Sequence, residues 1–312
     1  GLVYFGTGQT YKISVLLNPG PAGTRNDALY TDTTLALDPD TGKLVWHYQH
    51  MKREVWDLDW SFERTLATIP VKGVKRRVVM TMGKIGILDV LDAKTGQYLF
   101  SQDLGLQDLV SKIDPVTGEK TIRADAEPIA EQKRAICPFP TGIRNFQANS
   151  FDPATGTLYI AGTDTCMNFV WRPKEKDWDI AYGLIPRPGN DGQFGRVFAL
   201  DVAGRKGRWT QRGRAPASSA ALATAGGLVF EGARDRTFRA LDSATGKMLW
   251  QTRLTGVANG FPVSFAVGGR QCVAVTTGGG GPNDAAVQSL TPEIRNPGGT
   301  NLFVFCAPGK KG

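Results

Sequence analysis

An internal repeat constrains the fold of this chain more than any other feature of its sequence. In each copy an Asp begins a turn, Thr-Gly closes it, and an aromatic residue stands eight positions after the Asp. The clearest copies are Asp38 to Gly42 with Trp46, Asp92 to Gly96 with Phe100, and Asp242 to Gly246 with Trp250. Weaker copies begin at Asp152, with Thr155-Gly156, and at Asp201, with Trp209 in register but no Thr-Gly. The repeat indicates a chain built from similar strand-turn-strand units.

Each residue type in the repeat has a structural reason. The Asp side chain binds the backbone of its own turn, Gly adopts the positive φ, and the aromatic ring can pack between neighbouring units. The Asp positions are 41 to 60 residues apart, which suits one four-stranded blade per copy. A solenoid or a set of independent hairpins fits less well, because the spacing drifts and a lone hairpin cannot bury apolar strands. The sequence predicts an all-β chain, a β-propeller with four-stranded antiparallel blades, of which about five are present.

Composition agrees with this prediction. The chain has 312 residues, of which 41% are hydrophobic, with 38 Gly and 18 Pro, and its apolar runs are short. Such a chain can bury a large core, and we expect residues 1–312 to form one domain of many short strands. No run reaches the roughly 18 apolar residues of a membrane span. Because the chain opens directly in a strand without an initiator Met, we expect an N-terminally incomplete part of a longer protein.

The formal charge of +8 does not by itself indicate nucleic acid as a partner. The basic residues are scattered, and the one local cluster, Lys72 to Arg77, is typical of a hairpin loop. We therefore expect a solvated surface that could attract an acidic partner by long-range steering. The four cysteines include no Cys-x-x-Cys-His, and His47 and His50 are too few for a zinc site, so neither an attached c-type haem nor zinc is expected.

Several loops between the repeats resemble those of the quinoprotein alcohol dehydrogenases. The matching pieces are Gly6 to Gln9, Leu35 to Gln49, Val55-Trp56-Asp57, Gly83 to Gly86, Cys137 to Asn145, and Ala225 to Phe230. The resemblance implies a periplasmic, eight-bladed propeller that holds pyrroloquinoline quinone (PQQ) above a metal ion in its central channel. It further implies oxidation of an alcohol or sugar and transfer of the electrons to an acceptor such as a cytochrome c or a quinone.

The same resemblance assigns roles to individual residues. Asp57 lies in the Trp-Asp motif, whose carboxylate would act as the base that removes the substrate hydroxyl proton while hydride passes to the quinone. Lys84 corresponds to the cation set against the quinone carbonyl oxygens, and Asn145 to an amide that binds the cofactor. The structural alternatives are an ordinary loop Asp and an exposed hairpin Lys.

The metal ligands implied by the resemblance are Gln9, Asp57 and Asp59. Gln9 stands where many relatives carry Asn, and offers the same amide oxygen one methylene further out. A polar residue that only lines the channel is the alternative for Gln9. Asp59 adds a carboxylate that could accompany a lanthanide, although calcium is the default expectation for such oxygen ligands.

The cysteines are expected to differ in state. Cys137 and Cys166 match a structural disulfide of the family, whereas Cys272 and Cys306, on the last two apolar strands, are expected to be buried free thiols rather than a second bridge. The run Gly278 to Gly281 is followed by no helix pattern and no Lys-Ser/Thr, so we expect it to line the substrate channel and not to bind a nucleotide.

Two other functions remain open. One is a non-catalytic propeller scaffold of the outer-membrane assembly type, which would need no Asp57, Lys84 and Asn145 around one cavity. The other is a degenerate dehydrogenase kept for binding, which the Gln at position 9 favours. Relatives carry further site residues in N-terminal blades that this chain lacks, so we expect the chain alone to be inactive.

Overall fold

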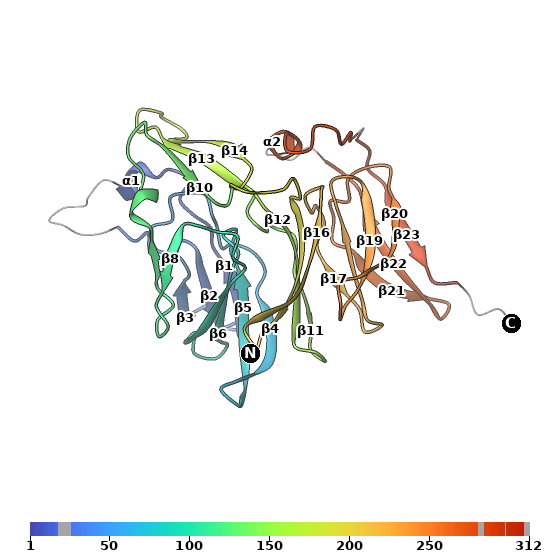
Figure 1. The fold of residues 1–312 in the computed structure, drawn as a ribbon. Coiled ribbons are helices and arrows are strands. Elements are labelled where there is room, and N and C mark those ends of the chain that lie inside the picture. The colour runs from blue at the N-terminus through green and yellow to red at the C-terminus, as the bar shows by residue number, and fades with distance from the viewer. Residues whose placement is uncertain (18–25, 280–283, 297, 309–312) are drawn as a thin grey trace. The chain divides into compact units, whose positions relative to one another are not determined.

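The structure, a computed structural model, describes residues 1–17, 26–279, 284–296 and 298–308. These residues form short antiparallel strands, with helix only at α1 (Ser14–Leu17), α2 (Asp284–Gln288) and the 3-10 turn η2 (Ala124–Ala126) (Figure 1). The prediction of an all-β chain is confirmed. Contacts group the chain into two compact units, the first made of residues 1–146 and 165–188, and the second of residues 147–164 and 189–312. The single domain over 1–312 stays a prediction.

The first unit contains two sheets with the strand order of a blade, in which consecutive strands are neighbours. Their strands are β1 (Val3–Gly6), β2 (Thr33–Leu37) and β3 (Leu44–Gln49), and then β4 (Thr65–Val71), β5 (Val74–Met82), β6 (Ile87–Asp92) and β7 (Tyr98–Asp103). The cluster Lys72 to Arg77, expected to form a hairpin loop, lies only partly in one: Lys72 is in the β4–β5 turn, while Lys75 to Arg77 are in strand β5. Two smaller sheets follow, formed by β8 (Val110–Ile113) with β9 (Lys120–Ile122), and by β10 (Lys133–Ile136), β13 (Cys166–Trp171) and β14 (Ile180–Ile185).

The second unit contains three more blade-like antiparallel sheets, and in the first of them β13 and β14 of the first unit intervene in sequence between the second and third strands. The first has β11 (Ser150–Asp152), β12 (Thr157–Thr163), β15 (Gly195–Asp201) and β16 (Lys206–Gly213). The second has β17 (Leu222–Ala223), β18 (Leu228–Gly232), β19 (Thr237–Asp242) and β20 (Met248–Arg253), and the third has β21 (Val263–Val267), β22 (Arg270–Thr276) and β23 (Leu302–Cys306). Within the described residues the chain thus has five blade-like sheets, three of them four-stranded.

The repeat turns have the predicted chemistry. Asp92 Oδ1 accepts hydrogen bonds from the backbone N–H of Lys94 at 3.0 Å and of Thr95 at 3.1 Å, and Gly96 takes a φ of 73°. The Trp46 ring of the preceding sheet rests on this turn, because a Cβ placed on Gly96 would lie 2.5 Å from it. A side chain at this Gly would therefore meet both a left-handed backbone and an occupied space.

The aromatic residues of the repeat pack between sheets to different extents. Trp46 Nε1 donates to Ala93 O at 3.3 Å, and Trp209 Nε1 donates to Ser243 O at 2.9 Å in the next sheet of its own unit. Trp250 remains 39% exposed, although its ring meets Phe305 of β23, in the following sheet, with centroids 5.2 Å apart. Phe100 is buried, and its packing between sheets stays a prediction.

The expectation that each copy of the repeat marks a separate blade is wrong. Asp152 lies at the β11–β12 turn and Asp201 at the β15–β16 turn of the same sheet. Another copy, Asp114 to Gly118, forms the same turn between β8 and β9, with Asp114 Oδ1 accepting from Thr117 N at 2.7 Å. The motif specifies a tight turn between antiparallel strands, and one blade offers several such places.

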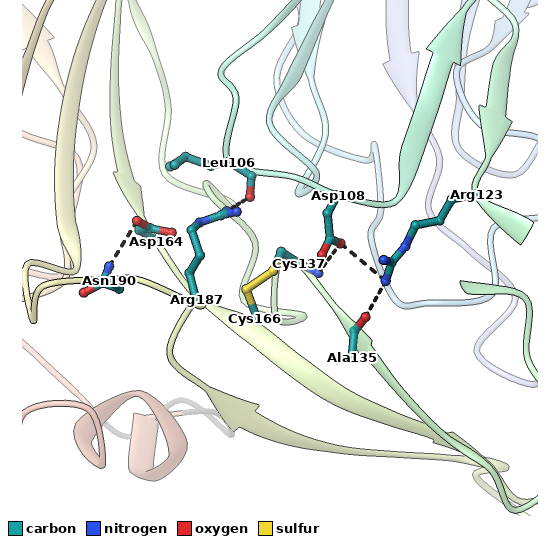
Figure 2. The surroundings of a disulfide bond; sticks show 9 residues. All are labelled: Leu106, Asp108, Arg123, Ala135, Cys137, Asp164, Cys166, Arg187 and Asn190. Carbon is teal, nitrogen blue, oxygen red and sulfur yellow. Dashed lines mark hydrogen bonds and ion pairs between the residues drawn. A yellow bond between two sulfur atoms is a disulfide. The ribbon is translucent and has the colours of Figure 1, made fainter. Parts of the chain in front are cut away.

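Both cysteine pairs form disulfides. Cys137 and Cys166 are bonded, with Cα atoms 4.0 Å apart, and Figure 2 shows the bridge beside Asp108, whose Oδ1 accepts from Cys137 N at 2.7 Å. The expectation of free thiols at Cys272 and Cys306 is wrong, because the register of β22 and β23 places them directly opposite each other and they are bonded. Strand register is a property that neither segment shows on its own.

Two expectations from the sequence concern the glycine run at 278–281 and membrane-spanning segments. Gly280 and Gly281 of the glycine run lie outside the described residues, so the expectation that this run lines a channel stays a prediction. Among the described residues, no helix has the length and apolar character needed to cross a membrane.

Candidate functional site

Four of the five predicted site residues meet in the first unit. Gln9 follows β1, Asp57 and Asp59 lie in the loop between β3 and β4, and Lys84 lies in the turn between β5 and β6. Lys84 Nζ is 2.7 Å from Asp57 Oδ1 and 3.0 Å from Asp59 Oδ2. Gln9 Nε2 donates to Asp57 Oδ1 at 3.0 Å. The four residues are only 4–7% exposed, so loops from three different strand ends build one buried polar group.

The turn that carries Lys84 depends on glycine. Gly86 has a φ of 80°, and its N–H donates to Gly83 O at 3.0 Å. A Cβ on Gly83 would lie 2.5 Å from the Trp60 ring, so only glycine lets the turn approach the indole this closely. Lys84 N donates to Asp59 O at 3.0 Å. The backbone therefore fixes the lysine against the loop that holds both carboxylates.

Burial and charge oppose each other at Asp57 and Lys84. Burial raises the pKa of Asp57, and the hydrogen-bonded Lys84 ammonium only partly offsets this effect. For Lys84 burial acts in the opposite direction, yet the charges of Asp57 and Asp59 raise its pKa above the ordinary value. Asp57 also has a φ of 63°, in a region that non-glycine residues rarely adopt. A strained residue with a perturbed pKa at a buried loop is a feature of functional sites.

Two further buried carboxylates, which sequence reasoning missed, lie close to this group. Asp32 Oδ1 accepts from Trp60 N at 3.0 Å, and Glu54 Oε1 accepts from Trp56 N at 2.6 Å. Burial raises the pKa of both carboxyls well above the ordinary values, and the charge of Asp59 adds to the effect. A cation placed beside these carboxyls would lower their pKa values and favour their ionised form. Neither residue belongs to a motif, and no sequence signal identifies them.

Tyr182, on β14, reaches the second oxygen of the Asp57 carboxylate. Its Oη donates to Asp57 Oδ2 at 3.4 Å, and the Phe139 ring meets the Tyr182 ring edge-on with centroids 5.4 Å apart. Burial, followed by the charge of Asp57, raises the pKa of Tyr182 to about 12, so the phenol keeps its proton at neutral pH. Sequence reasoning missed Tyr182 because the segment around it matches no motif.

Asn145 is held within its own loop. Its Nδ2 donates to Thr141 O at 3.2 Å, and its Oδ1 accepts from Phe146 N at 2.9 Å. The same loop reaches the site through Ile143 N, which donates to Lys84 O at 2.7 Å. The structure thus brings the loop of Asn145 against Lys84, while the cofactor contact of the Asn145 side chain stays a prediction.

Arg144, to which the sequence assigns no role, anchors this loop. The residue is 2% exposed, and its Nη1 donates to Met82 O at 2.6 Å at the end of β5. It also pairs with Glu63, and its guanidinium lies 4.8 Å from the centroid of the Phe62 ring. Its contacts are those of a structural residue.

A second buried network adjoins Trp60 in the β3–β4 loop. The His50 ring stacks on Trp60 with centroids 4.6 Å apart, and Lys120 Nζ lies 4.8 Å from the Trp60 ring centroid. His50 Nδ1 is 2.7 Å from Asp89 Oδ2, and Nε2 is 2.7 Å from Thr34 Oγ1. Burial lowers the pKa of His50 to about 4, despite the opposing effect of Asp89. The network therefore holds the neutral His50 imidazole against the Trp60 indole, which in turn packs against Gly83 in the turn that carries Lys84.

The oxygen atoms of the site fit a hard cation in type. Gln9 Oε1 is buried and has no hydrogen-bond partner in the described part of the chain. Amide and carboxylate oxygens such as those of Gln9, Asp57 and Asp59 are the ligands that calcium prefers. Across the residues that the structure describes, however, no three His, Cys, Asp or Glu side chains form a group that could hold a metal ion. These residues could therefore supply only part of a coordination shell.

Comparison with known proteins places these observations in one family. The model described as "PQQ: Glucose/ethanol/alcohol dehydrogenase, beta-propeller domain" matches residues 1–104 and 188–273. Lupanine 17-hydroxylase [cytochrome c] of Pseudomonas sp is 31% identical over 99% of this chain and 44% of its own length. Quinohemoprotein alcohol dehydrogenase of Comamonas testosteroni is 30% identical over 99% of this chain, again with 44% of its own length covered.

The structural comparison agrees. The solved structure of a europium-containing methanol dehydrogenase superimposes with a TM-score of 0.87 at 27% identity, covering 97% of this chain and 56% of that chain. The propeller prediction is confirmed. The chain spans less than half the length of these curated relatives. With the family model matched over more than half of its residues, the chain belongs to the PQQ glucose/ethanol/alcohol dehydrogenase family of β-propeller proteins.

Proposed function

We propose that this chain forms part of an oxidoreductase that oxidises an alcohol or sugar by base-assisted hydride transfer to PQQ held over a metal ion. The observation that carries the proposal is the buried group in which Lys84 joins Asp57 and Asp59, with Gln9 on the same carboxylate. A non-catalytic scaffold has no need for a charged group that is removed from solvent in this way, since burying unneeded charges costs stability.

Lys84 and Asn145 would hold PQQ, and Gln9, Asp57 and Asp59 would contribute oxygen ligands to the metal. When bound, PQQ supplies the two-electron acceptor and the metal supplies positive charge beside it. Calcium is the default ion for these ligands, with a lanthanide as the alternative. Among the relatives, a lanthanide-dependent methanol dehydrogenase of Methylorubrum extorquens is 28% identical over 90% of this chain.

Asp57 and Lys84 have different roles in the proposed reaction. Asp57 Oδ1 accepts hydrogen bonds from Gln9 and Lys84, which leaves Oδ2 as the oxygen that can take the proton of a substrate hydroxyl. Burial raises the pKa of Asp57 and so increases its strength as a base. The Lys84 ammonium keeps the carboxylate ionised before the reaction and stabilises negative charge that develops beside it.

We also propose a periplasmic location and a cytochrome c or a quinone as the electron acceptor. The disulfides Cys137–Cys166 and Cys272–Cys306 support an oxidising compartment. Two relatives, lupanine 17-hydroxylase and the 1-butanol dehydrogenase of Thauera butanivorans, carry "cytochrome c" in their names.

The test is reconstitution of the full-length protein. The purified protein is loaded with PQQ and either calcium or a lanthanide, and an artificial dye then reports oxidation of a panel of alcohols and sugars. Dye reduction that requires PQQ, the metal and an alcohol or sugar supports the proposal. Stoichiometric PQQ binding without dye reduction by any substrate, with either metal, contradicts it and favours a binding protein.

A further inference from the structure

Among the described residues that hydrogen-bond to the Asp57 carboxylate, Tyr182 alone has no role in the proposed mechanism. Asp57 Oδ1 already has two donors, Gln9 Nε2 at 3.0 Å and Lys84 Nζ at 2.7 Å. Oδ2, the oxygen left to act as the base, faces the Tyr182 hydroxyl at 3.4 Å. The group next to the reacting oxygen is therefore a neutral hydrogen-bond donor on an aromatic ring.

The length of this contact matters. Hydroxyl-to-carboxylate hydrogen bonds are usually about 2.5–2.7 Å long. At 3.4 Å, Tyr182 Oη and Asp57 Oδ2 are too far apart for a strong bond, but an alcohol oxygen can lie within hydrogen-bond distance of both. Such an oxygen would donate its proton to Oδ2 and accept the proton of the phenol.

The position of Tyr182 is fixed from both ends of its hairpin. Near the start of β13, the Cys137–Cys166 disulfide ties the hairpin to the loop that carries Phe139. At the β13–β14 turn, the buried Asp179 carboxylate accepts from Ile13 N at 3.0 Å and Ser14 N at 2.8 Å. Between these anchors, Phe139 packs edge-on against the Tyr182 ring. Preorganised donors of this kind lose little entropy when they bind a substrate.

We propose that Tyr182 binds the substrate hydroxyl together with Asp57, as a catalytic residue that donates to the alcohol oxygen while Asp57 Oδ2 takes its proton. This inference rests on the proposed function and adds to it a second protein contact for the reacting hydroxyl. In the step, the alcohol O–H bond breaks and an O–H bond forms at Asp57. Tyr182 keeps its own proton throughout, and the electron pair of the α C–H bond leaves as hydride to PQQ.

The experiment uses the full-length protein and two Tyr→Phe variants. Tyr182→Phe removes only the hydroxyl at Asp57. Tyr159→Phe is the matched control, because Tyr159 is buried in the second unit and its Oη donates to Ser243 O at 3.0 Å. Thermal unfolding and PQQ content are measured first to show that both variants fold and take up the cofactor.

Binding of 2-methyl-2-propanol, which has no α hydrogen and cannot be oxidised, is followed by ligand-observed NMR titration. Tyr182→Phe is expected to weaken this binding by about 3- to 10-fold, the contribution of one neutral hydrogen bond, and to lower kcat/KM for a primary alcohol similarly. Tyr159→Phe is expected to match the wild type in both measurements.

The outcomes separate this inference from the proposed function. If the wild type oxidises alcohols and Tyr182→Phe equals it in binding and in kcat/KM, the role of Tyr182 is refuted while the function stands. If the wild type oxidises neither an alcohol nor a sugar, the function is refuted, and the NMR titration still decides whether Tyr182 binds a hydroxyl. Absence of any binding to the wild type also refutes the inference.

Discussion

Acid should destabilise this protein through His50, and the structure gives the size of the effect. Arg64 Nε donates to Thr34 Oγ1 at 3.1 Å, so the Thr34 hydroxyl proton is free to point at His50 Nε2. Nδ1–H then donates to Asp89. This arrangement suits a neutral imidazole, which agrees with the low His50 pKa of about 4.

The sign follows from the two states of the chain. The unfolded chain has a His pKa of about 6.5, above the folded value of about 4. Between these values the unfolded chain binds a proton that the folded protein does not, so the stabilising effect is complete above pH 6.5 and is lost as the pH falls toward 4. From pH 7 to pH 5 the loss is about 2 kcal/mol. The lowered pKa of Asp89 acts in the same direction but below this window.

Urea unfolding at pH 7 and pH 5 measures this difference. The wild type should lose about 2 kcal/mol more between the two pH values than His50→Gln, which cannot take up the proton. His47→Gln, which changes the other histidine of this chain, an exposed one, should lose as much as the wild type. Equal losses in the wild type and His50→Gln, within about 0.5 kcal/mol, would refute the reasoning.

Two predictions concern the scaffold. Gly96→Ala should lower the free energy of unfolding by about 1–3 kcal/mol more than Gly42→Ala. Both glycines have a positive φ, but only a Cβ at Gly96 would clash with the Trp46 ring. Equal losses of the two variants in urea unfolding would contradict the packing of the Trp46 ring on this turn. Replacing Cys137 and Cys166 together by Ser should cost about 3–4 kcal/mol, since the bridge closes a loop with a sequence separation of 29. A change below about 1 kcal/mol in the same assay would show that the bridge contributes little to stability.

The parts of the fold that the sequence predicts are local. The Asp92 turn follows from residue types a few positions apart, and the structure has it. The place of Trp46 within its own copy of the repeat indicated that its ring packs against a neighbouring unit, and its Nε1 donates to Ala93 O there. The five blade-like sheets among the described residues also agree with the predicted number of blades, although Asp152 and Asp201 share one of them. A turn motif predicts that two antiparallel strands are connected, but it does not indicate to which sheet they belong.

The residues of the candidate site likewise fall into those that the sequence predicted and those that it missed. Asp57 and Lys84 were predicted because their loops resemble those of a known family, and the structure brings them together. Asp32 and Tyr182 were missed, because each reaches the site through a contact over a long sequence separation. Glu54 was missed because its contact with Trp56 is local and nothing in the surrounding sequence signals its burial. The Cys272–Cys306 bridge was missed for the same reason, since it depends on the register of two strands.

The most direct test of the proposed function is Asp57→Asn in the full-length protein loaded with PQQ and the metal. The substitution keeps the size and polarity of the side chain but removes the base. PQQ binding, followed by absorbance titration, should be retained, and turnover with the best alcohol should fall by about 10²–10⁴-fold. Full turnover of Asp57→Asn with PQQ bound would contradict the assignment of Asp57 as the catalytic base.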